Sequence, residues 1–227
     1  MRSGSTTAAS LAVAVLWCAA ACGEKTSAPK PAPAQLLGIE FGSGLRIPRE
    51  EIDAFDPYFD ALDARVGHKQ RHRVLLERHL LPLALVRDGF RPRYDEAMQR
   101  AQELCRVAGN SREFERIASL AGGERIEHRQ RTQLPLPVSR FARDESVIGA
   151  VSPPLPTAEG IWVVTVLEIA HGLTLSDDYL TLFAVKFPVP DTPSLSDWLD
   201  HRHAEVRGMP VHCDDDLRDA LPDWLRS

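Results

Sequence analysis

Several features that would point to a familiar class of protein are scarce or missing in this sequence. The longest stretch of small and apolar residues, 8–21, covers 14 positions, fewer than the roughly 20 that a helix needs to span a bilayer. Lys and Arg do not gather in one segment and the formal net charge is −5, which argues against a nucleic-acid-binding protein. We also find no phosphate-binding glycine loop, no hydrolase-like set of serine, histidine and acid, and no internal repeat.

What is present is typical of a folded protein. The chain is 44% hydrophobic and 26% charged, with both signs of charge mixed along its length. This composition is enough for a core. Residues 1–22 read as a targeting signal, and their removal from 227 would leave 205 residues, which suits one domain or two small ones.

The N-terminal stretch has the order of an export signal. Arg2 precedes the apolar residues 8–21, and the stretch ends in Ala19-Ala20-Ala21-Cys22. Small residues directly before a cysteine resemble the lipobox of bacterial lipoproteins, although Ala19 stands where that motif usually has leucine. The resemblance implies a lipid on Cys22. Gly23 after the cysteine implies the outer membrane, with the protein facing the periplasm. An ordinary cleaved secretory signal is the alternative.

Only four cysteines are present, and Cys105 and Cys213 are the two outside the expected signal region. In an oxidising compartment they can form a disulfide. Alternatively they stay isolated thiols, with Cys105 packed as a small apolar residue of the core. The sequence leaves both alternatives open.

The first half of the expected mature chain is mostly helical in pattern. Residues 23–35 (GEKTSAPKPAPAQ) predict a semi-extended tether. Apolar spacing and turn residues then predict a hairpin at 36–47 and a first helix from Pro48 to Gly67. A second helix is expected over 71–90, with a kink at Pro82. Two further helices are expected, over 92–107 and from Asn110 to Gly122. Asn110 and Glu113 have the spacing of a capping box.

The second half changes in character. Residues 161–169 (IWVVTVLEI) are apolar and β-branched on both faces, which predicts a central strand, and 179–189 predict a second strand. Short helices are expected at 138–141, 196–206 and 214–220. The charge run 125–131 (RIEHRQR) is interpreted as a solvated loop, with contact to anionic lipid head groups near the tether as the alternative.

A series of short motifs follows a recognisable order between residues 94 and 169. In chain order these are Ala97 and Ala101, Phe114-Glu-Arg-Ile-Ala118, Gly122-Gly123, Leu134-Pro135, Val138 to Phe141, Gly149-Ala-Val-Ser-Pro-Pro-Leu-Pro-Thr157 with Gly160, and the strand Ile161 to Ile169. This order resembles the parvulin (PpiC-type) peptidyl-prolyl isomerase domain. The upstream helices, 49–90, resemble the N-terminal helical part of periplasmic SurA-like chaperones.

The resemblance implies an α+β fold, in which an N-terminal helical part precedes a degenerate parvulin-like domain with a small antiparallel sheet flanked by helices. It also implies a shallow apolar groove for a proline ring, no cofactor, and unfolded or extended exported polypeptides as partners. The expected organisation is a signal at 1–22, a tether at 23–35, a helical part at 36–92, a parvulin-like domain at 93–190 and a helical extension at 191–227.

The motifs depart from the family at the groove. Active members commonly carry a histidine in the last strand, where this chain has Gly160-Ile161-Trp162. The first family strand is not clear either. His79-Leu80-Leu81 can be read as that strand, but the pattern around it fits a helix better, in which case the sheet lacks a strand or borrows one from 39–47 or 179–189. Phe141 and Trp162 are the candidate groove residues, with core packing as the alternative for Phe141, and no catalytic residue is assigned.

Histidines were weighed as metal ligands. His68, His72 and His79 have near-helical spacing, but the neighbouring Lys and Arg favour a solvated polar face. A second group, His201, His203, His212 and Cys213 before Asp214, matches no known motif, and capping of a helix by Asp214 explains it better. We therefore expect no metal.

Three functional hypotheses follow. The first is an isomerase-like folding factor for exported proteins, and the second is a non-catalytic chaperone or assembly lipoprotein with the same layout. A purely structural lipoprotein that binds no peptide is the third.

Overall fold

The computed structural model describes residues 38–62 and 67–225. The expected signal with Cys22 and the tether at 23–35 therefore lie outside the described residues. Residues 36–227 cluster into one unit through their contacts. None of the helices described is both long and apolar enough to cross a membrane.

The helix expected after Pro48 forms as two helices, α1 (Arg49–Asp53) and α2 (Asp56–Leu62). Pro57 explains the division, because proline has no N–H for the carbonyl four residues earlier and its ring crowds that carbonyl. Four apolar positions follow the helical spacing of this segment: Ile52, Phe55 and Phe59 are buried, and Leu62 is half-buried.

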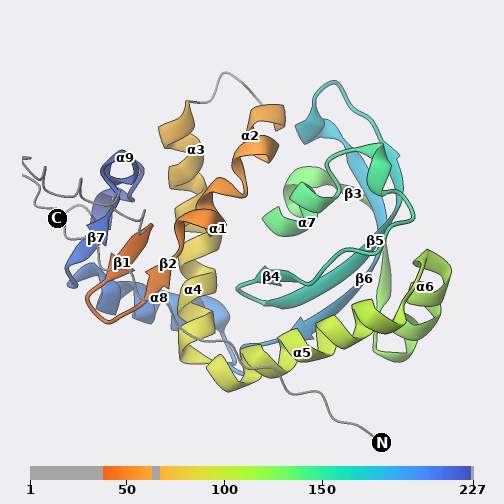
Figure 1. Ribbon diagram of the computed structural model, residues 1–227, viewed down its shortest axis with the longest axis horizontal. Helices are drawn as coiled ribbons and strands as arrows, with labels where there is room; N and C mark the ends of the chain where they lie inside the picture. The colour runs from red at the N-terminus through yellow and green to blue at the C-terminus, as the bar shows by residue number, and fades with distance from the viewer. Residues whose placement is uncertain (1–37, 63–66, 226–227) are drawn as a thin grey trace, which may run out of the picture. The chain divides into compact units, whose positions relative to one another are not determined.

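The predicted long helix over 71–90 is confirmed, with a local irregularity. It consists of α3 (His68–Leu75), a π-helical turn η1 (Leu76–Leu80) and α4 (Leu81–Gly89), which follow one another along one axis in Figure 1. The π turn ends just before Pro82, where a regular helix would lose a hydrogen bond and meet the proline ring. The disturbance expected at Pro82 thus takes the form of a widened turn.

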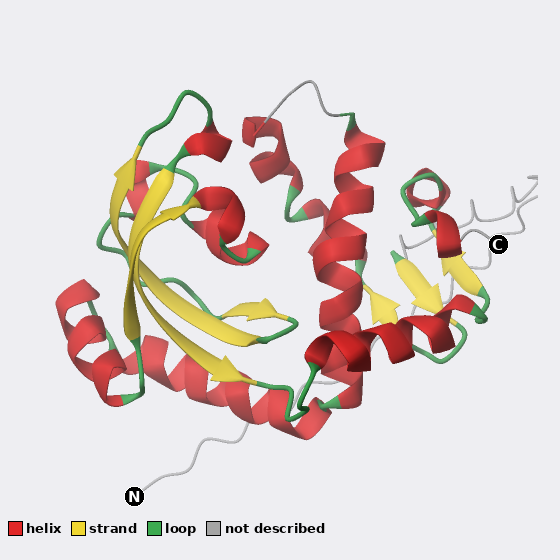
Figure 2. Ribbon diagram, turned by 180° about the vertical axis from the view of Figure 1, so that it is seen from behind, coloured by secondary structure: helices red, strands yellow, loops and turns green. Residues whose placement is uncertain are grey.

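The main sheet has four antiparallel strands, visible as the twisted sheet in Figure 2. They are β3 (Glu124–Gln130), β4 (Leu155–Thr157), β5 (Gly160–Ala170) and β6 (Tyr179–Pro188), in the order β3-β6-β5-β4. The prediction of a central strand at 161–169 is confirmed. Of the two segments that could complete this sheet, 179–189 takes an inner position, between β3 and β5.

Helices cover both faces of this sheet. On one face, α5 (Arg91–Val107) and α6 (Ser111–Leu120) pack on Ile161 and Val163 of β5. On the other face, α7 (Leu136–Phe141) packs on Val164 and Val166. The side chains of β5 alternate between the two apolar clusters, as the pleat requires. The Asn110 cap is confirmed, because its side chain accepts a hydrogen bond from Glu113 N at 3.0 Å. The reciprocal half of the predicted capping box does not form among the described residues, because the Glu113 carboxylate pairs with Arg116 instead.

The interpretation of the charge run 125–131 as a loop is wrong. Residues 124–130 form the edge strand β3, which pairs with β6 along its length. Charged side chains on an edge strand are common, because they discourage pairing with another chain. The charge run therefore belongs to a mostly exposed edge strand, apart from Arg131, which follows the strand and is buried.

A second sheet of three short strands is formed by both ends of the unit. The predicted hairpin is confirmed as β1 (Ile39–Phe41) and β2 (Arg46–Ile47), and β7 (Val211–Cys213) pairs with β1. Helices α8 (Leu195–Arg207) and α9 (Asp215–Arg218) match the expected C-terminal helices. The coarse prediction of an α+β fold with small antiparallel sheets is confirmed.

Candidate functional site

A cavity of about 760 Å³ lies between the helices α2 and α3 and the α7 face of the main sheet. This size is within the range of small-molecule and cofactor sites. We call it the central cavity. Its helical wall consists of Tyr58, Phe59, Leu62, Val74, Arg78 and His79, its sheet side of Glu124, Ile126, Arg129, Thr157, Ala158, Glu159, Trp162 and Lys186, and the rest of Arg131 to Leu136, Ser139 and Ser176.

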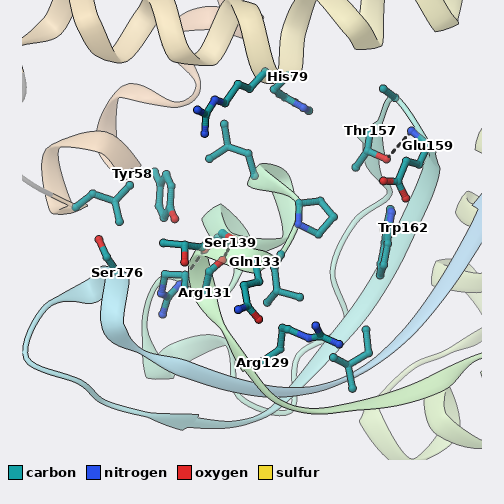
Figure 3. Close-up of a pocket in the computed structure, with 18 of the residues that line it drawn as sticks. Tyr58, His79, Arg129, Arg131, Gln133, Ser139, Thr157, Glu159, Trp162 and Ser176 are labelled. Atoms are coloured by element: carbon teal, nitrogen blue, oxygen red, sulfur yellow. Dashed lines mark hydrogen bonds between the residues drawn. The ribbon is translucent and has the colours of Figure 1, made fainter. Parts of the chain in front are cut away.

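Trp162 lines the central cavity from β5, as Figure 3 shows. Strand periodicity puts its side chain on the same face as Val164 and Val166, and it is half-buried. Lys186 lies over its ring, 5.6 Å from the centroid, and pairs with Glu159 at 3.1 Å. The ring thus forms an apolar surface at the cavity, with the Lys186–Glu159 ion pair over one of its faces.

Phe141, the other candidate groove residue, has a different position. It is half-buried and packs against the apolar cluster of Val138, Val164 and Leu182, and Trp162 packs against the same cluster. Phe141 is not among the residues that line the central cavity. The structure therefore brings the two residues to one cluster, but only Trp162 faces the open space.

His79 enters the central cavity from the opposite wall (Figure 3). Its side chain is 7% exposed and packs edge-on against Phe55, with ring centroids 5.3 Å apart. Burial, assisted by the nearby charge of Arg140, lowers the pKa of His79 to about 4. At neutral pH its imidazole is uncharged, so it can both donate and accept a hydrogen bond.

Below the cavity, Arg131 is fully buried and pairs with Asp178 at 3.0 Å. Its other terminal nitrogen donates to the carbonyl oxygens of Ser139 at 2.9 Å and Ala142 at 2.7 Å. Burial raises the pKa of Asp178, but the backbone N–H of Gly172 and the Arg131 guanidinium outweigh it and lower the pKa overall. The pair joins the end of β3 to α7 and to the start of β6.

The expectation of a solvated face for the first histidine group is wrong for two of its members. His72 is 1% exposed and lies 2.8 Å from Asp56, and His79 is buried in the cavity wall. Asp56 at the start of α2 contacts His72, and Phe55 just before α2 packs against His79, so both rings face inwards. The side chain of His68 lies outside what the structure describes.

The second histidine group is spread over separate contacts. His201 is exposed beside Glu205, and the ring of His203 lies 5.5 Å from that of Trp224. Asp214 stands at the N-cap of α9, but its carboxylate accepts from Gly38 N at 3.1 Å instead of capping that helix. Within the described ranges no three His, Cys, Asp or Glu side chains are grouped so that they could hold a metal ion.

Both cysteines are free. Cys105 packs with the cluster under α5 and donates to the carbonyl of Ser152 at 3.3 Å, whereas Cys213 packs in the cluster around the second sheet. Of the two alternatives that the sequence left open, the structure has isolated thiols. Burial raises the pKa of both, which makes them poor nucleophiles.

Sequence reasoning missed His79 and Arg131 as members of a site. His79 was assigned to a solvated polar face of its helix, and Arg131 was the last residue of the charge run that was interpreted as a loop. The one signal for His79 was its position among leucines that are buried on all sides of the helix. Comparison with known proteins adds no relative, since no family model, curated protein or solved structure matches this chain.

Proposed function

We propose that this protein is a peptidyl-prolyl isomerase-like folding factor, which binds extended segments of exported polypeptides in the central cavity. The parvulin-like order of motifs between residues 94 and 169 supports this proposal. The proposal includes a lipid anchor on Cys22 in the outer membrane, with the folded unit facing the periplasm.

The observation that carries the proposal is that Trp162 faces an open cavity. A tryptophan that filled the core would leave no surface for a ligand, but this ring borders about 760 Å³ of space. Leu134, Pro135 and Phe59 add apolar surface to the same cavity. A proline ring stacked on Trp162 would bury apolar area on both partners, which favours binding by roughly 25 cal/mol per Å².

Isomerase chemistry makes few demands on a site, and the central cavity meets most of them. Rotation about an X–Pro bond needs no covalent intermediate, and its barrier of about 18–20 kcal/mol falls when a site holds the twisted amide better than the planar one. The half-buried Trp162 supplies a partly desolvated surface. The neutral imidazole of His79 supplies a hydrogen-bonding group on the opposite wall.

A non-catalytic chaperone is the second candidate function. The observation that favours it is the presence of Trp162 at the position where active family members commonly have histidine. Such a protein would hold an extended chain in the central cavity without speeding isomerisation.

The experiment is an X–Pro exchange measurement by NMR on short proline peptides, with a soluble form that begins at Gly23. We expect cis–trans exchange above the spontaneous rate, and loss of the acceleration in Trp162→Ala. Leu120→Ala is the matched control, because Leu120 is an exposed apolar residue on α6, on the far face of the sheet. Binding without acceleration would favour the chaperone. If the peptides neither bind nor isomerise faster, the hypothesis of a structural lipoprotein remains.

The anchor is tested separately. The full-length protein with Cys22 should fractionate with outer membranes and carry a lipid detectable by mass spectrometry. Cys22→Ser should lose both, and recovery of an unlipidated wild-type chain in the soluble periplasmic fraction would indicate an ordinary secretory signal.

A further inference from the structure

The charged side chains around the central cavity do not balance one another. Lys186 is paired with Glu159 at 3.1 Å, and the buried Arg131 is paired with Asp178 at 3.0 Å. That leaves two arginines on the lining, Arg78 on the helical wall and Arg129 on β3, against one carboxylate, Glu124. Across residues 38–62 and 67–225 none of these three forms an ion pair.

A bulge in β3 turns Arg129 toward the cavity. Ile126 pairs with Leu182 and Arg129 pairs with Leu180, so Glu127 and His128 together oppose the single residue Thr181. Regular alternation from Glu124 and Ile126 would put residue 128 on the cavity face. The extra residue shifts the alternation by one and puts Arg129 there instead, which is a known use of bulges.

The bulge requires an unfavourable backbone conformation at His128. His128 has φ +49°, in the left-handed region that non-glycine residues rarely adopt. Its ring lies beside Tyr179, with centroids 5.4 Å apart. A strained backbone position of this kind often accompanies a functional site.

A third arginine, Arg140, lies behind the helical wall and does not itself line the central cavity. Arg140 donates to the carbonyl of Ala54 at 2.9 Å and lies over the ring of Phe55, 4.4 Å from its centroid. Phe55 is the residue against which His79 of the cavity wall packs. Among the residues described, Arg140 has no carboxylate partner, and its positive charge is one cause of the lowered pKa of His79 on the cavity wall.

We infer that the central cavity selects extended peptides that carry a carboxylate beside a proline or another apolar residue. The carboxylate would contact Arg129 and Arg78, and the apolar side chain would lie on Trp162. This inference rests on the proposed function, because it names the class of peptide that the same cavity takes. The carboxylate can come from an Asp or Glu side chain or from a free C-terminus, since both present the same group to an arginine.

The test uses three peptides and calorimetric or NMR titration with the form that begins at Gly23. The peptides are acetyl-Ala-Glu-Pro-Phe-amide, acetyl-Ala-Gln-Pro-Phe-amide and acetyl-Ala-Gln-Pro-Phe with a free C-terminus. We expect the first or the third to bind roughly fivefold more tightly than the second, the scale of a partly exposed charge pair. The advantage should shrink in high salt, because exposed charges are screened.

The variants identify the contacts. In the double variant Arg78→Gln, Arg129→Gln, the charged and uncharged peptides should bind equally. Arg125→Gln is the matched control, because Arg125 is an exposed arginine of the same strand that pairs with Glu127 at 3.1 Å and does not line the cavity. It should keep the full preference.

The outcomes separate this inference from the proposed function. A preference for the Glu peptide points to internal acidic segments, and a preference for the free C-terminus points to chain ends. Either preference supports the inference if it disappears in the double variant. Equal binding of all three peptides overturns the inference and leaves the proposed function standing. Binding of none of them overturns both.

Discussion

Arg131 and Asp178 form a fully buried ion pair, with Nη2 and Oδ2 3.0 Å apart and side-chain exposures of 0% and 2%. The two residues are 47 positions apart in the chain. Arg131 also holds the carbonyls at the end of α7, and Asp178 accepts from Gly172 N at 3.0 Å. The pair therefore ties β3, α7 and β6 together directly beneath the central cavity.

Loss of one partner should destabilise the fold strongly. Arg131→Met would leave the Asp178 carboxylate with only the half-exposed His171, 3.4 Å away, as a cationic neighbour, and the carbonyls of Ser139 and Ala142 without a donor. We expect the free energy of unfolding to fall by about 3–5 kcal/mol, measured by urea denaturation. Arg125→Met, on the exposed side of β3, should change it by less than about 0.5 kcal/mol. Equal effects of the two variants would contradict the role given to the buried pair.

Replacing both partners separates packing from charge. In Arg131→Met with Asp178→Leu, no buried charge remains unpaired, so part of the loss should be recovered. The carbonyls of Ser139 and Ala142 and the N–H of Gly172 stay without these partners, so recovery should be incomplete. A double variant that is as unstable as the sum of the single variants would show that the pair acts through other contacts.

The local features of the fold were largely predictable from the sequence. Apolar spacing located the helix of residues 92–107 and the strand of 161–169, and Asn110 marked a helix start. These predictions hold because periodicity and capping are encoded within a few neighbouring residues. The charge run 125–131 was misinterpreted because an edge strand with two exposed sides has no apolar alternation to reveal it.

The site was less predictable, because it depends on contacts between distant segments. Trp162 was identified through its place in a motif, and the structure does put it on the cavity. His79 and Arg131 gave no comparable signal, since their burial results from α2, α7 and β6 packing around them. The bulge at His128 was also hidden, because no glycine marks the left-handed position.

The backbone of His128 gives a prediction about the bulge. At φ +49° a glycine is tolerated and a β-branched residue is strained. His128→Gly should therefore be more stable than His128→Val, by about 1 kcal/mol, in thermal or urea unfolding. Both variants lose the contact with Tyr179, so the comparison isolates the backbone.

Arg125 supplies the control for that comparison. It lies in the same strand in regular pairing with Phe183, where valine should be more stable than glycine because of its β propensity. The same order of stability at both positions would count against a strained backbone at His128.

The two candidate groove residues should respond differently to truncation. Phe141→Ala and Trp162→Ala each remove a half-buried ring from the same apolar cluster, so each should lower the free energy of unfolding by about 1–3 kcal/mol. Only Trp162→Ala should weaken binding of proline peptides, because only Trp162 lines the central cavity. Peptide titration under conditions where both variants are folded tests this, and a larger binding loss in Phe141→Ala would place the binding surface elsewhere.

His79 should make the protein sensitive to acid. Its pKa is about 4 in the folded chain against 6.5 for an unperturbed histidine, because burial disfavours the charged ring. Above pH 6.5 the ring is neutral in both states, so it adds no pH dependence there. Between pH 6.5 and about 4 the unfolded chain takes up the proton first, so stability falls as the pH is lowered, by roughly 3 kcal/mol in total.

Replacement of His79 isolates this contribution from that of the carboxylates. His79→Leu keeps an apolar side chain against Phe55 and cannot be protonated, so its stability should fall less steeply than that of the wild type between pH 6.5 and 4. Urea unfolding at several pH values measures the difference between the two curves, from which the shared carboxylate titrations cancel. Parallel curves would mean that the ring takes up its proton in the folded protein as readily as in the unfolded chain, and that His79 is not held neutral at the cavity.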